Sequence, residues 1–94
     1  MDKATLVRRR ASFKAALTVQ ENFLADFSIT SAHDYEKVVS RLERIPTIFN
    51  KYDEVQTEIE SLEEQDQAQP ELIERQEFED RYFNLVANCK ILLN

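Results

Sequence analysis

The absence of glycine constrains this 94-residue chain more than any other feature of its sequence. Tight hairpin turns, β-bulges and phosphate-binding loops use positive φ angles, which glycine adopts at the least cost. A chain without glycine is poorly suited to β-hairpins, and it lacks the loops of P-loop and Rossmann nucleotide sites. The sequence therefore predicts an all-α fold that binds no nucleotide in these ways.

Residues that carry out chemistry are scarce. The single cysteine, Cys89, cannot form an internal disulfide, and the single histidine, His33, belongs to no cluster at metal-ligand spacing. Cys89 shares the helical phase of neighbouring leucines, which predicts a buried thiol rather than a redox centre. We expect no catalytic residue, no metal, no cofactor and no small-molecule substrate, and hence no enzyme.

Three segments carry apolar residues at steps of three and four, which predicts three helices. The expected helices cover residues 2–28, 31–64 and 70–93. Ser31 and Asp34 are spaced as a capping box at the start of the second helix. Pro70 suits the first turn of the third helix, where its missing N–H would be unpaired anyway. The polar residues 63–69 are expected to form the loop before it.

Pro46 lies inside the apolar pattern of the second helix. A proline there removes a backbone hydrogen bond and clashes with the carbonyl four residues back, at a cost of about 3 kcal/mol. The helix could break near Ile45 and restart, or continue with a kink. Because the apolar phase is the same on both sides of Pro46, we favour a kink with a continuous apolar seam.

The expected architecture is a single domain over residues 1–94, an antiparallel three-helix bundle or helical coiled coil. Short connections favour antiparallel neighbours, and the second helix is the longest. The candidate core or interface residues are the large apolar side chains of the three seams. They are Phe13, Leu17, Leu24, Phe27, Leu42, Phe49, Tyr52, Ile59, Phe78, Tyr82 and Leu85.

Charge is distributed unevenly along a chain whose formal net charge is -6. Residues 1–14 hold five cations and one acid, whereas residues 53–80 hold twelve acids and one cation. The basic patch comprises Lys3, Arg8, Arg9, Arg10 and Lys14. It could make a weak contact with RNA or an anionic membrane. Alternatively, Arg8 and Arg9 lie on a solvated helix face and pair with the later acidic segment, which we favour because the net charge opposes general nucleic-acid affinity.

No run of about 18 apolar residues is present, and no apolar stretch follows the basic start as in a signal peptide. The expected localisation is intracellular, and cytoplasmic by default.

Two blocks of residues carry a more specific pattern than the helical period. They are Asp-Glu-Val-Gln-Thr-Glu-Ile-Glu at 53–60 and Phe-Glu-Asp-Arg-Tyr-Phe at 78–83. Together with the basic start, these blocks resemble the N-terminal region of Gag polyproteins of BEL/Pao-type LTR retroelements. The resemblance covers nearly the whole chain, although Pro46 departs from the uninterrupted helix expected of that family.

The resemblance implies a structural protein of a retrotransposon. Its role would be that of a matrix-like or coiled-coil module that promotes Gag self-association during assembly of virus-like particles. The expected partner is therefore a protein, by default a second copy in a symmetric dimer. One alternative is a domesticated helical adaptor that binds another cellular protein. The other is a peripheral membrane or RNA contact through the basic first helix.

Overall fold

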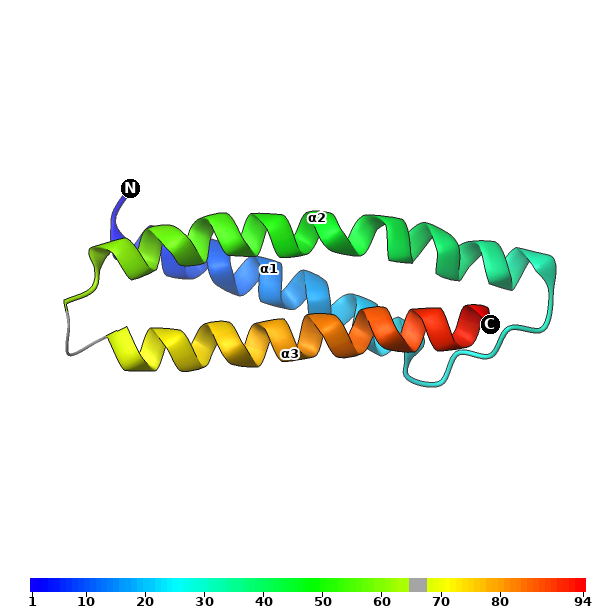
Figure 1. Ribbon diagram of the computed structural model, residues 1–94. Coiled ribbons are helices and arrows are strands. Elements are labelled where there is room, and N and C mark those ends of the chain that lie inside the picture. The colour runs from blue at the N-terminus through cyan, green and yellow to red at the C-terminus, as the bar shows by residue number, and fades with distance from the viewer. Residues whose placement is uncertain (65–67) are drawn as a thin grey trace.

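Three helices account for most of the residues that the structure, a computed structural model, describes: 1–64 and 68–94 (Figure 1). Helix α1 is Lys3–Leu24, α2 is Ala32–Leu62 and α3 is Ala68–Leu93. Successive helices run antiparallel, and α1 and α3 both pack along α2 in an elongated bundle of 51 × 21 × 17 Å. The predicted all-α three-helix bundle is confirmed.

The first two helices begin at the side chains that cap them. Asp2 Oδ1 accepts a hydrogen bond from the Thr5 backbone N–H at 2.8 Å, which satisfies one free donor at the start of α1. Ser31 Oγ accepts from the Asp34 N–H at 3.1 Å in the same way at the start of α2. The predicted cap at Ser31 is therefore where α2 begins.

Three of the predicted helix boundaries are wrong by two residues or more: the end of α1, the start of α3, and the end of α2, which lies at Leu62. Helix α1 ends at Leu24, four residues early, and the Phe27 N–H donates to the Leu24 carbonyl at 3.3 Å beyond the helix. Phe27 still packs on the core, with its ring 4.6 Å from that of Phe23. An apolar residue in a connecting turn can thus continue the helical spacing without being helical.

The third helix starts earlier than expected. Ala68 and Gln69, which were expected to belong to a loop, are helical, and Pro70 lies within the first turn of α3. Proline is tolerated there because the first N–H groups of a helix have no intrahelical partner. Residues 65–67 of the predicted loop lie outside the described residues.

Helix α2 continues through Pro46 without interruption (Figure 1). The alternative of a break near Ile45 is wrong, because Ile45, Ile48 and Tyr52 follow one another in the buried seam across the proline. Packing of this seam against both neighbouring helices offsets the backbone cost of Pro46.

All the candidate core residues named from the sequence are either buried or packed against the core. Leu17, Leu24, Tyr52, Ile59, Phe78 and Leu85 are buried. Phe13, Phe27, Leu42, Phe49 and Tyr82 are partly buried and pack against the main core cluster. At its centre the Tyr52 and Phe78 rings stack with centroids 3.6 Å apart. Cys89 is fully buried in the same cluster, and burial raises the pKa of its thiol.

Candidate functional site

Arg10 lies at the centre of a polar cluster where the three helices meet. Its Nη1 donates to Glu71 Oε1 at 2.7 Å and to Gln56 Oε1 at 3.1 Å, and its Nε lies 3.5 Å from Glu74 Oε1. Gln56 is fully buried and donates in turn to the Glu71 carbonyl oxygen at 3.2 Å. The Tyr52 hydroxyl donates to the Glu74 carbonyl oxygen at 3.3 Å. These polar groups satisfy one another and hold the start of α3 against α1 and α2.

The electrostatics of this polar cluster favour a charged Glu71 carboxylate and a neutral Tyr52 phenol. Burial alone would raise the pKa of Glu71, but hydrogen bonds from Gln56 and the charge of Arg10 outweigh it, so the pKa is lowered. Burial, reinforced by the nearby Glu74 carboxylate, raises the pKa of Tyr52. The phenol therefore stays protonated as a hydrogen-bond donor.

The structure divides the predicted basic patch. Lys3 and Lys14 each pair with a carboxylate of the acidic segment, as Arg10 does. Arg8 and Arg9 are exposed, and neither forms an ion pair with any of the described residues. The expectation that Arg8 and Arg9 lie on a solvated helix face is confirmed, but they pair with none of the described carboxylates of the acidic segment. Lys3, Arg10 and Lys14 pair with such carboxylates because their positions on α1 face α2 and α3.

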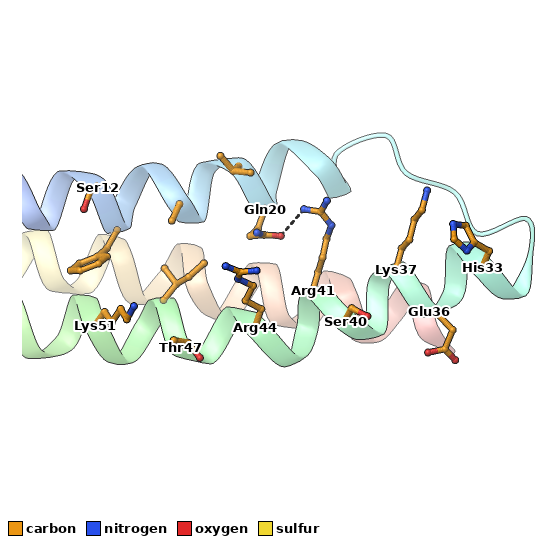
Figure 2. A pocket seen from close by; sticks show the side chains of 14 residues that line it. Ser12, Gln20, His33, Glu36, Lys37, Ser40, Arg41, Arg44, Thr47 and Lys51 are labelled. Carbon is orange, nitrogen blue, oxygen red and sulfur yellow. Dashed lines mark hydrogen bonds between the residues drawn. The ribbon is translucent and has the colours of Figure 1, made fainter.

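A groove of about 890 Å³ runs between α1 and α2, with α3 on the far side (Figure 2). Apolar side chains from both helices line it: Phe13, Ala16, Val19 and Ile48. The cations along it all come from α2: Lys37, Arg41, Arg44 and Lys51. We call this surface the α1–α2 groove. It joins an apolar lining to a row of positive charges in a chain that is acidic overall.

The cations share one side of α2 because of their spacing. Steps of four, three and seven residues from Lys37 through Arg41 and Arg44 to Lys51 return to nearly the same helix face. At about 1.5 Å per residue, the row is about 21 Å long. Figure 2 shows Lys37, Arg41 and Arg44 extending toward α1, whereas Glu36, the carboxylate among the lining residues, points away from it.

Arg41 is the anchored member of this row. Its Nη1 donates to Gln20 Oε1 of α1 at 2.9 Å, and its guanidinium carbon lies 3.5 Å from the centroid of the Phe23 ring (Figure 2). By contrast, Lys37, Arg44 and Lys51 are exposed, and within residues 1–64 and 68–94 none of them forms an ion pair. These three cations are free to bind a negatively charged partner.

The sequence analysis missed this groove because it counted charge by segment. The four cations of α2 are spread over 15 residues, and Glu36 and Glu43 lie next to two of them, so residues 35–51 show no basic run. Plotting these charges around the helix axis would have revealed the groove cations, since all four fall on one face of the helix.

The described residues show little that could support other kinds of site. His33 lines one end of the α1–α2 groove, beside Lys37 (Figure 2). Within the described part of the chain, no three His, Cys, Asp or Glu side chains are grouped so that they could hold a metal ion. None of the helices described is both long enough and apolar enough to cross a membrane.

Comparison with protein-family models, curated proteins and solved structures found no match for this chain. The resemblance to Gag N-terminal regions therefore stays a prediction, and the α1–α2 groove is the feature from which a function can be argued.

Proposed function

We propose that this chain is a non-enzymatic protein-interaction module that binds an acidic amphipathic helix in the α1–α2 groove. The observation that carries the proposal is the combination of apolar lining residues with Lys37, Arg44 and Lys51, which form no ion pair among the described residues. A partner with apolar side chains flanked by acids complements both features.

The shape of the groove favours a helix as the occupant. Two antiparallel helices with an apolar channel between them form half of a four-helix bundle, and another helix laid in the channel completes it. Val19, which lies in the channel, is 60% exposed and would be covered by such a helix. Apolar anchors at spacings of three and four residues are the general mode of helix-in-groove recognition.

Two features argue against the alternatives of RNA or membrane contact. Lys3, Arg10 and Lys14 of the basic patch are already occupied by carboxylates. In the α1–α2 groove, phosphates would leave the apolar lining uncovered. Self-association in the manner of a Gag N-terminal region stays a prediction, as does the adaptor role.

The test is binding of designed helical peptides to the intact protein. Two labelled peptides of about 21 residues would share one leucine stripe and carry either Glu or Lys on its flanks. We expect the Glu peptide to bind at least about tenfold more tightly, and its affinity to fall as salt rises. Replacing Arg44→Glu should weaken binding, whereas the matched change Arg9→Glu, outside the lining residues, should not.

Two results would contradict the proposal. One is equal affinity for the Glu and Lys peptides. The other is a single-stranded oligonucleotide that binds the groove while the Glu peptide does not. Circular dichroism of each variant checks that the helices are intact.

A further inference from the structure

An exposed stripe runs along α3 on the side opposite its buried residues. Steps of three and four residues connect its members, which are Ile73, Gln76, Asp80, Phe83, Ala87 and Ile91. Three of them are large apolar side chains: Ile73 is 45% exposed, Phe83 59% and Ile91 69%. We call this surface the α3 stripe. The Phe83 ring is partly covered by Tyr82 and Phe49, whose ring centroids lie 5.0 and 6.2 Å away, but more than half of the side chain stays exposed.

Carboxylates surround the aromatic ring at the middle of the α3 stripe. Phe83 lies in a shallow hollow lined also by Gln76, Glu77, Glu79 and Asp80. Arg75 Nη1 approaches Glu79 at 3.5 Å, whereas Glu77 and Asp80 form no ion pair with any residue in the described part of the chain. The α3 stripe therefore presents an exposed apolar residue flanked by acids, the chemical inverse of the α1–α2 groove.

We infer that the helix bound by the α1–α2 groove is α3 of a second copy of this chain, seated through its α3 stripe. The inference rests on the proposed function and adds the identity of the partner. Phe83 enters the apolar channel beside Ala16 and Val19, and Glu77 and Asp80 meet the cations of α2. The α3 stripe from Ile73 to Ile91 covers about 27 Å, which is long enough to lie along the whole cation row of about 21 Å.

The position of the two surfaces makes this contact intermolecular. The α1–α2 groove opens on the side of the bundle away from α3 (Figure 2), and the α3 stripe lies on the side of α3 opposite its buried residues. Because the contact joins two different surfaces, one copy keeps its stripe free and the other keeps its groove free after pairing. Such a heterologous contact produces a ring or an open chain rather than the symmetric dimer expected by default.

Sedimentation velocity over a concentration series of the full chain tests the inference. The wild-type protein should form species larger than a dimer as its concentration rises. A stripe variant, Glu77→Lys with Asp80→Lys, and a groove variant, Lys37→Glu with Arg44→Glu, should each associate at least about tenfold more weakly. The matched pair Glu54→Lys with Glu58→Lys, exposed on α2 outside the groove lining, should associate at least as strongly as wild type.

Mixing the two variants gives the sharper result. The stripe variant keeps an intact groove and the groove variant an intact stripe, and the two reversed surfaces are again opposite in charge, so an equimolar mixture should associate more strongly than either variant alone. A strictly monomeric wild-type protein, or a dimer that neither double variant weakens, would overturn the inference. If the monomeric protein still binds the Glu-flanked peptide, only the inference of self-pairing fails. If it binds neither a second copy nor the peptide, the proposed function fails as well.

Discussion

The polar cluster around Arg10 and the α1–α2 groove both contain arginine side chains, but these are paired with carboxylates in the cluster and, among the described residues, unpaired in the groove. In the cluster, Arg10 is 16% exposed and meets the carboxylates of Glu71 and Glu74 within its own chain. In the groove, Arg44 is exposed and meets no carboxylate in the described residues. A cation that is paired and partly buried contributes to the fold, whereas an unpaired, exposed one beside an apolar channel is available to a partner. The type of residue alone does not distinguish the two.

The largest expected difference is in the free energy of unfolding of two arginine variants. Arg10→Ala removes the charged donor shared by Glu71, Glu74 and Gln56, although Gln56 still bonds Glu71 and Lys14 still pairs with Glu74, and should cost about 2 kcal/mol. Arg44→Ala removes an exposed side chain and should change stability by no more than about 0.5 kcal/mol. Urea denaturation followed by circular dichroism measures both. Similar costs at the two positions would remove the distinction between cluster and groove.

A smaller effect is expected at Arg75, which joins α2 to α3 beyond the cluster. Its Nε donates to Glu60 at 2.8 Å and its Nη2 to the Thr57 hydroxyl at 3.2 Å. Arg75→Lys keeps the charge but loses the planar set of donors, so the unfolding free energy should fall by about 1 kcal/mol. The same denaturation measurement applies, with Arg8→Lys on the exposed face of α1 as the control. A stable Arg75→Lys protein would mean that charge alone holds these helices together.

The loss of folding stability at acidic pH should depend on Glu71. Its pKa in the folded protein lies below the ordinary value of 4.5, so the stabilisation is present above that pH and is lost as the pH falls through the folded pKa. Glu71→Gln should be less stable than wild type at neutral pH and should lose less stability on acidification. Thermal melts between pH 3 and 7, about the range in which carboxylates titrate, would show this. Parallel curves for the two proteins would contradict it.

The smallest effect is expected at Arg41, the groove cation that is anchored to α1. Arg41→Ala removes the hydrogen bond to Gln20 and the contact with the Phe23 ring, which together should stabilise the fold by about 1 kcal/mol or less. Its loss should fall between those of Arg10→Ala and Arg44→Ala. If Arg41→Ala destabilises as strongly as Arg10→Ala, the groove is part of the structural core.

Much of the fold follows from spacing in the sequence. The seams at steps of three and four predict the helices, and Ser31 marks the start of α2 because its hydroxyl can only cap from a position just outside the helix. The end of α1 did not follow, because Phe27 keeps its place in the core from a turn as well as from a helix. Pro46 did not break α2, because the buried residues on both sides of it hold the helix to its neighbours.

The candidate site was harder to predict than the fold. The basic patch drew attention because its cations are adjacent in the sequence, yet folding pairs Lys3, Arg10 and Lys14 with carboxylates about 60 residues away. The four cations of the α1–α2 groove are spread over 15 residues of the sequence, from Lys37 to Lys51, so they form no basic run. Which charges remain unpaired depends on the approach of distant helices, and a single sequence contains no direct record of that approach.

Nuclear magnetic resonance mapping of the Glu-flanked peptide on the ¹⁵N-labelled protein tests the central claim most directly. We predict that the largest backbone shift changes lie along both walls of the α1–α2 groove, at Ala16 and Val19 of α1 and at Lys37, Arg44 and Lys51 of α2. Shift changes centred on Arg8 and Arg9, or on the polar cluster at Gln56 and Glu71, with the groove unaffected, would contradict it.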